Sequence, residues 1–157
     1  ARLKDAANAH KSIGILVGDF ARENLLSISP AGIAGAPYDI FIFDGNAAGA
    51  AGIGEMLIQS HEGYIEFLPC LPEQWNKGSY KGLCVRGGAE VSADWNNSVI
   101  NYASVKATAA NSFSIKIPQN KNKPYRILLN GKTIKTVPDT HRIITIPMKA
   151  GDLLEIK

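Results

Sequence analysis

One carboxylate in this chain, that of Asp44, stands in a setting where it could act on a substrate. It begins the turn Asp44-Gly45-Asn46, between an apolar run and a stretch of small residues. A carboxylate that a glycine-rich turn exposes at a cavity can serve as a general base. The same residue types also suit an N-cap or an Asx turn, in which the carboxylate accepts backbone N–H bonds. The spacing alone leaves both interpretations open.

The other ionisable side chains are explained more simply by structure. His10 lies on an apolar stripe, where packing accounts for it, and His61 follows a helical pattern whose C-terminal dipole favours a cation. Glu55 projects from a glycine-rich helix and suits an ion pair with a loop cation. No nucleophile elbow, phosphate-binding loop, HExxH pair or CxxC pair occurs. We therefore expect no metal and no organic cofactor.

The composition is typical of one globular domain, or of one domain with a piece of another: 157 residues, 45% of them hydrophobic and 20% charged. The formal net charge of +3 comes from scattered basic residues, with one short cluster at residues 121–123. Tracking phosphates needs a concentrated basic stripe, so nucleic acid is not an expected partner. No apolar stretch approaches the ~18 residues of a membrane helix, so no membrane span is expected.

Two residue types leave alternatives open. Cys70 and Cys84 each sit in an apolar run without a metal-binding neighbour, which indicates buried small hydrophobes, with a single disulfide as the alternative. Trp75 and Trp95 suit the core or edge of a β domain, whereas an exposed tryptophan would indicate stacking on a sugar.

The residue pattern in the first third of the chain predicts two helices joined by a long loop. Apolar residues at intervals of three and four predict a helix over residues 3–20, which has no N-cap in front of Arg2 and reads like an element cut from something longer. Residues 27–49 predict a long ordered loop that lines a cavity. A second helix is expected from 47 to about 60, with three glycines that imply a close neighbour, and Gly63 suits the position after its last turn.

Beyond Gly63 the period changes to two, which predicts an all-β domain. Turns are expected at Asn96-Asn97 and at Asn130-Gly131, and nine short strands favour a β-sandwich. The predicted strands are residues 64–68, 80–86, 90–95, 99–107, 113–117, 125–129, 133–137, 142–146 and 153–156. The chain as a whole is α+β, with a helical segment at residues 1–62 and a β-sandwich at 63–157.

Five segments in this order resemble the C-terminal region of glycoside hydrolase family 95. They are FIFDGN (41–46), AGIGEMLIQSH (51–61), LPCLP (68–72) with Trp75, KGL (81–83) and RGG (86–88). The resemblance covers most of residues 24–95, and the later strands match in character alone. Members of this family are inverting α-L-fucosidases, some acting on α-L-galactosides, with an (α/α)6 catalytic barrel and a C-terminal β domain.

The resemblance implies that residues 1–62 are the last helices of such a barrel and that Asp44 is the catalytic base. It also implies a second carboxyl group, the acid, together with water-holding asparagines, in a part of the barrel upstream of this chain. Tyr38 takes the place of a sugar-contacting histidine, and Asn46 neighbours the base but lacks the aromatic residue that usually follows it. These departures leave fucose and L-galactose both open.

The expected function is therefore that of a C-terminal part of an inverting exo-α-L-glycosidase that removes terminal L-fucose or L-galactose from glycans. Its partners would be such a glycan and the rest of the barrel, and its location would be secreted or periplasmic by resemblance. Alone the chain is expected to be inactive. The alternative is a non-catalytic carbohydrate-binding or structural β-sandwich module. A third possibility, docking on a separate barrel half, predicts an exposed apolar face on residues 3–20 and 47–60.

Overall fold

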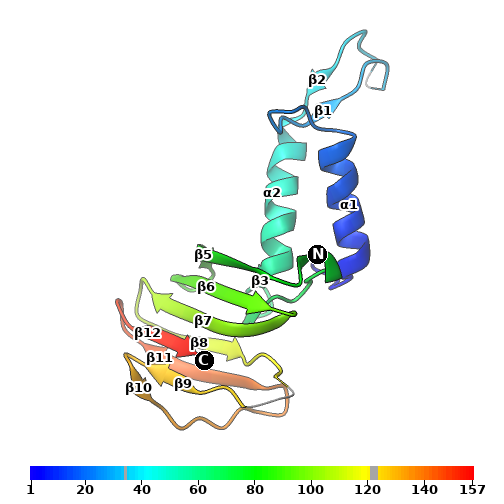
Figure 1. Ribbon diagram of the computed structural model, residues 1–157. Coiled ribbons are helices and arrows are strands. Elements are labelled where there is room, and N and C mark those ends of the chain that lie inside the picture. The colour runs from blue at the N-terminus through cyan, green and yellow to red at the C-terminus, as the bar shows by residue number, and fades with distance from the viewer. Residues whose placement is uncertain (34, 121–123) are drawn as a thin grey trace.

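The fold has two parts, a pair of helices with a small hairpin and a β-sandwich (Figure 1). It is seen in a computed structural model, which describes residues 1–33, 35–120 and 124–157. The short basic cluster at 121–123 lies outside the described residues. The helical part contains α1 (Ala6–Gly18), β1 (Ile28–Ser29), β2 (Ile40–Phe41) and α2 (Phe43–Leu57).

The first helix is shorter than expected and is capped. α1 begins at Ala6, and the Asp5 side chain accepts a hydrogen bond from the backbone N–H of Asn8 at 3.0 Å. This is the usual N-cap arrangement, which satisfies an N–H group that the helix itself leaves unpaired. The expectation of an uncapped helix starting near residue 3 was therefore wrong, because the cap stands three residues further along.

The second helix begins earlier than expected, at Phe43, and ends at Leu57. The loop predicted to extend to residue 49 thus stops at Ile42, and Asp44 lies inside the first helical turn. The close neighbour implied by the glycines is α1, since a Cβ on Gly49 would come within 2.7 Å of the Leu16 side chain. Gly63 does adopt a left-handed conformation, but in the turn between β3 and β4 and not after the helix.

The β part consists of two sheets. The first has the order β11-β8-β4-β3 and the second the order β10-β9-β12-β7-β6-β5; the only parallel pair among the described strands is β4 with β8. A single-turn 3-10 helix, η1 (Glu73–Trp75), precedes β5. The strand bounds are β3 (Ile58–Gln59), β4 (Ile65–Phe67), β5 (Gly78–Val85), β6 (Ala89–Asn96), β7 (Val99–Ala107), β8 (Asn111–Lys116), β9 (Ile127–Leu129), β10 (Lys132–Thr133), β11 (Ile143–Met148) and β12 (Leu153–Ile156).

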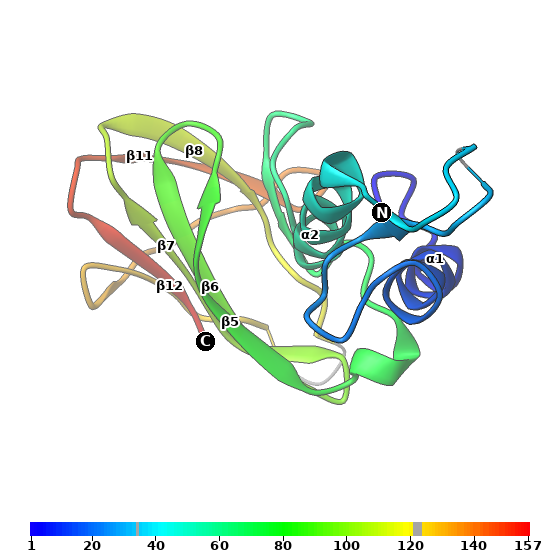
Figure 2. The same ribbon diagram turned by 90° about the horizontal axis from the view of Figure 1, so that it is seen from above.

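Both sheets contribute to one hydrophobic core. Side chains alternate along the strands, and the inward set includes Val91 and Leu154 from one sheet and Phe113 and Ile115 from the other, all at most 3% exposed. The two sheets lie as layers around this core (Figure 2). A β-sandwich is confirmed, and each of the nine predicted strands has a counterpart, although the predicted 133–137 strand shrinks to β10.

Two tight turns set the register of neighbouring strands. Asn97 and Ser98 connect β6 to β7, and Asn130 and Gly131 connect β9 to β10, all four with positive φ. Two consecutive left-handed residues are typical of a type I′ turn, whose twist matches that of the strands. Both turns were predicted, the first one residue too early.

Candidate functional site

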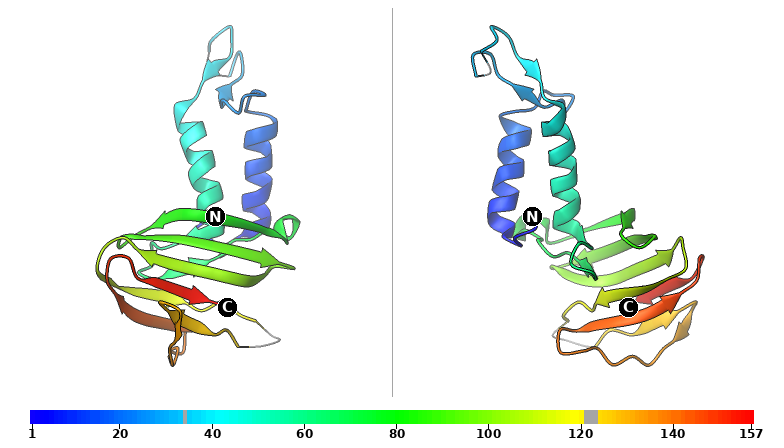
Figure 3. Two further views of the ribbon diagram at one scale, coloured as in Figure 1. Left: turned by 60° about the vertical axis from the view of Figure 1, so that its left-hand side comes forward. Right: turned by 180° about the vertical axis from the view of Figure 1, so that it is seen from behind.

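The residues expected to act on a substrate lie at the end of the helical pair that points away from the sandwich (Figures 1 and 3). Asp44 and Asn46 are in the first turn of α2, and Tyr38 is in the connection between β1 and β2. The three thus come from neighbouring elements at one end of the fold. No described contact joins Tyr38 to Asp44, so their use in one site stays a prediction.

The Asp44 side chain is exposed and has few described hydrogen bonds. Its carboxylate accepts a hydrogen bond from the adjacent Gly45 N–H at 3.0 Å, while the N-cap position belongs to Ile42, which makes no side-chain cap bond. A carboxylate in a first helical turn also interacts favourably with the helix dipole. The N-cap interpretation is therefore wrong for Asp44, whereas the local backbone contact remains. The general-base interpretation stays a prediction.

Asn46 holds the start of α2 against the preceding segment. Its side-chain oxygen accepts from the Ser27 N–H at 2.7 Å, and its side-chain nitrogen donates to the Leu25 carbonyl at 2.9 Å. Gly45 allows this approach, because a Cβ there would lie 2.3 Å from the Ser27 hydroxyl. Asn46 thus positions the turn that carries Asp44, a role that its sequence neighbours did not reveal.

Aromatic side chains surround this end of the helices and face outward. Tyr38 is 69% exposed, Phe41 51% and Phe43 75%. Nearby, the side chains of Arg22 and Asp39 form an ion pair across the hairpin. The result is an exposed apolar surface beside an exposed carboxylate.

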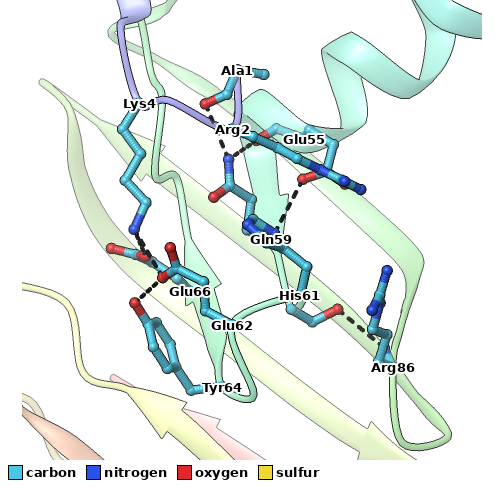
Figure 4. A network of polar contacts seen from close by, with 11 residues as sticks. Ala1, Arg2, Lys4, Glu55, Gln59, His61, Glu62, Tyr64, Glu66 and Arg86 are labelled. Carbon is cyan, nitrogen blue, oxygen red and sulfur yellow. Dashed lines mark hydrogen bonds and ion pairs between the residues drawn. The ribbon is translucent and has the colours of Figure 1, made fainter.

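A second group of polar residues joins the N-terminal segment, α2 and the sandwich (Figure 4). Glu55 accepts from Arg2 at 2.7 Å and faces His61, whose Nδ1 lies 3.7 Å from the other carboxylate oxygen. The hydrogen bond from Arg2 lowers the pKa of Glu55, against the opposing effect of burial, and the charges of His61 and Arg86 act with Arg2. Glu55 is thus an ion-pair residue, as its sequence setting predicted, with Arg2 as the partner.

Glu66 is held between two lysines at the same junction. Lys4 and Lys116 each donate to its carboxylate at 2.7 Å. Burial alone would raise the pKa of Glu66, but these two hydrogen bonds outweigh it and leave the pKa below its ordinary value. The alternation of Ile65, Glu66 and Phe67 shows that Glu66 faces away from the core, but its partners come from distant segments that no sequence pattern connects.

A cavity of about 450 Å³ opens between α2 and the edge strand β5. Its lining includes Glu55, His61, Cys84 and Arg86. Cys84 is exposed and Cys70 is buried, and both thiols are free, so the alternative of a disulfide was wrong and only Cys70 is the expected buried hydrophobe. Within the described ranges, no three His, Cys, Asp or Glu residues are placed to hold a metal ion.

The tryptophans belong to the packing of the molecule. Trp95 is 5% exposed, and its indole N–H donates to the Trp75 carbonyl at 2.7 Å. Trp75 is half-buried and meets the His10 ring edge to face, with centroids 5.9 Å apart. Both tryptophans thus take part in packing, as expected of the core and edge of a β domain, and His10 is the packing histidine that was expected. In the part of the chain that the structure describes, no helix is long and apolar enough to cross a membrane.

The fold defines a β-sandwich domain joined to a helical segment with an exposed carboxylate-bearing end. Comparison with known proteins gives the family. The family model for the glycoside hydrolase family 95 C-terminal domain matches residues 59–156, which contain β4 to β12 of the sandwich. The chain belongs to glycoside hydrolase family 95.

A curated relative agrees with this assignment. The chain is similar to alpha-L-fucosidase 2 of Arabidopsis thaliana, with 43% identity over 56 residues. The matched segment is 35% of this chain and 7% of that protein, so the chain spans only a small part of its relative's length.

Proposed function

We propose that this chain is the C-terminal part of an inverting exo-α-L-glycosidase that removes terminal L-fucose or L-galactose from glycans. The observation that carries the proposal is the exposed Asp44 carboxylate at the free end of the helical pair, in a chain of glycoside hydrolase family 95. The printed name of the plant relative supports fucose as the first sugar to test. A secreted or periplasmic location belongs to the same proposal.

In this proposal Asp44 is the general base. An inverting glycosidase needs one carboxylate to activate water and a second carboxyl group, about 6.5–9.5 Å away, to protonate the leaving oxygen. Asn46 positions the turn that carries the base, and Tyr38 contributes a hydroxyl and a ring for the sugar. The acid would come from upstream helices, so the 157 residues alone would be inactive.

The apolar exposure of the helical pair supports a larger helical assembly. α1 has no buried residue, and Ile15 and Val17 are 43% and 46% exposed. Ile15 and Val17 lie on different sides of α1, and apolar side chains exposed on several sides of a helix are typical of a helix that other elements cover. We infer that α1 and α2 are the last two helices of an (α/α)6 barrel and that the other barrel helices cover them, within one chain or as a separate half.

The experiment is hydrolysis of aryl α-L-fucoside and aryl α-L-galactoside by the protein extended upstream. Asp44→Asn is expected to lower kcat by about 10²–10⁴-fold, the usual contribution of a general base. Asp19→Asn is the matched control, since Asp19 is an exposed residue at the C-terminal end of α1. Full activity of Asp44→Asn would overturn the assignment of the base.

A second candidate is a purely structural β module. The burial of Trp95 and the packing of Trp75 on His10 favour a scaffold that braces the helical pair. If the extended protein cleaves neither glycoside while this chain remains folded, the structural role is the function that stands.

A further inference from the structure

Strands β9 and β10 lie on the side of the sandwich away from the helices (Figure 1). A cavity of about 870 Å³ opens beside these two strands. Its walls come from the described ends of the connection between β8 and β9 and from the segment that follows β10. Its volume lies in the range of about 300–1,000 Å³ that is usual for small-molecule sites. The proposed active site, at the far end of the helical pair, includes none of these residues.

The charged side chains described in the wall of this cavity are all basic. Arg126, Lys135 and Arg142 line it, and no aspartate or glutamate is among the described residues of its wall. None of the three has a carboxylate within 4.0 Å among the described residues. The acid that follows in the loop, Asp139, already accepts two backbone N–H bonds, from His141 and Ile143. The cavity therefore presents three cations whose charge is free for an anionic ligand.

Arg142 is held in place at the wall of this cavity. Its backbone has a φ of 65°, in the left-handed region that costs a non-glycine residue free energy. Its N–H donates to the Asp139 carbonyl at 2.9 Å, its carbonyl accepts from the Ile117 N–H at 2.8 Å, and its guanidinium donates to the Ile117 carbonyl at 3.3 Å. One described bond uses one of the five N–H groups of a guanidinium, which leaves donors for a carboxylate or sulfate.

The remaining lining suits a sugar ring. Tyr125 is half-buried, its hydroxyl donates to the Ile100 carbonyl at 2.9 Å, and this bond fixes the ring along the cavity. Ile134 and Pro138 add apolar surface, and Gln119 adds an amide. Pyranose rings combine apolar faces with hydroxyl edges, so they match a mixed wall of this kind. The described lining holds three cations and one ring, fewer than the extended basic stripe that a nucleic acid needs.

We propose that this cavity binds an acidic oligosaccharide, with Arg126, Lys135 and Arg142 contacting carboxylate or sulfate groups and Tyr125 packing against a sugar ring. The sandwich would then hold the protein on a charged glycan while hydrolysis takes place elsewhere. Binding at this site requires no catalysis, so its test is independent of the assignment of Asp44.

The test is affinity electrophoresis of this chain with polygalacturonate, dextran sulfate and neutral dextran. We expect retardation by one or both charged polymers and none by dextran; uronate and sulfate ligands are distinguished by which polymer binds. Arg126→Gln with Lys135→Gln should weaken binding at least about tenfold, the usual effect of losing charge-assisted hydrogen bonds. The matched control is Lys77→Gln with Lys81→Gln, which removes the same charge at the opposite edge of the same sheet.

Three outcomes would overturn the proposal: no binding to either charged polymer, equal loss in both double variants, or double-stranded DNA bound as tightly as the glycans. Amide chemical-shift mapping on the unmutated chain gives a second measurement that no folding defect can affect. The shifts should change at Ile117 and Ile134 and stay constant along β5. Changes spread evenly over the surface would count against the site.

Discussion

The helical pair and the β-sandwich differ in how many of their apolar side chains they bury. α1 has no buried residue and α2 buries only Gly49 and Met56, whereas the sandwich encloses a core contributed by both sheets. Burial of apolar area is the main favourable contribution to folding. The sandwich therefore receives most of this contribution, and the helical pair receives little of it.

Polar contacts link the two regions. Lys4, in the segment before α1, donates to Glu66 of the sandwich, and the Nδ1 of His61, which follows β3, lies 3.7 Å from the Glu55 carboxylate of α2. Hydrogen bonds between charged groups each contribute modestly in water-accessible places, although they fix direction well. One region is thus built by its core, whereas the other is oriented by ion pairs and leaves apolar side chains such as Ile15 and Val17 exposed. Three predictions test this difference.

The largest effect is expected in the core of the sandwich. Leu154 is fully buried, so Leu154→Ala should lower the free energy of unfolding by about 3 kcal/mol through lost burial and a residual cavity. The measurement is urea denaturation of the whole chain. Leu3→Ala is the control in the other region, because Leu3 is 94% exposed and its removal should change stability by less than about 0.5 kcal/mol. Equal losses of unfolding free energy in Leu154→Ala and Leu3→Ala would contradict the view that the two regions differ in apolar burial.

Two glycine substitutions are expected to change stability by intermediate amounts, one lowering it and the other raising it. In Gly78→Ala the new Cβ would lie 2.5 Å from the buried Trp95 ring, and overpacking of this kind costs about 1–3 kcal/mol. In Gly54→Ala the Cβ meets nothing within 4 Å, so helix propensity should stabilise α2 by about 0.5–1 kcal/mol. Hydrogen exchange measured residue by residue separates the two. Stabilisation by Gly78→Ala would show that the Trp95 contact is not rigid.

The smallest effect concerns the junction and depends on pH. The pKa of Glu66 is depressed from 4.5, so its contribution is fully present above that pH and is lost as pH falls through the lower pKa of the folded state. Because its ion pairs with Lys4 and Lys116 lie at a partly water-accessible junction, Glu66→Gln should cost about 0.5–1 kcal/mol at neutral pH and progressively less in acid. The comparison is denaturation of both proteins from pH 7 to 3, with Glu90→Gln on the exposed face of β6 as control. A pH-independent difference would exclude the ion-pair mechanism.

The sandwich was largely predictable from local patterns. Alternation of apolar residues located its strands, and two-residue turns such as Asn130-Gly131 located the connections between them. Each of these signals is contained in a few consecutive residues, so it can be recognised in the sequence. The predicted elements were wrong where contacts between different segments determine the start or the existence of an element. β3 forms by pairing with β4, and the early start of α2 depends on contacts with residues such as Ser27, neither of which a local period reports.

The candidate site was predictable to a smaller extent. Asp44 and its turn stood out by residue type, and the resemblance placed the chain in a family that the later match confirmed. The positioning role of Asn46 required two hydrogen bonds to residues about twenty positions away. The basic cavity was not foreseen, since Arg126, Lys135 and Arg142 look scattered along the chain.

The sequence by itself determined the β-rich class of the fold, the places of its tight turns to within one residue and the family, because these follow from short periods and contiguous motifs. Only the tertiary structure decided which charges meet. Lys4, Glu66 and Lys116 lie far apart along the chain, and folding brings them within hydrogen-bond distance. Electrostatic pairing depends on distance in space, whereas a sequence pattern reports distance along the chain, and the two agree only within single elements.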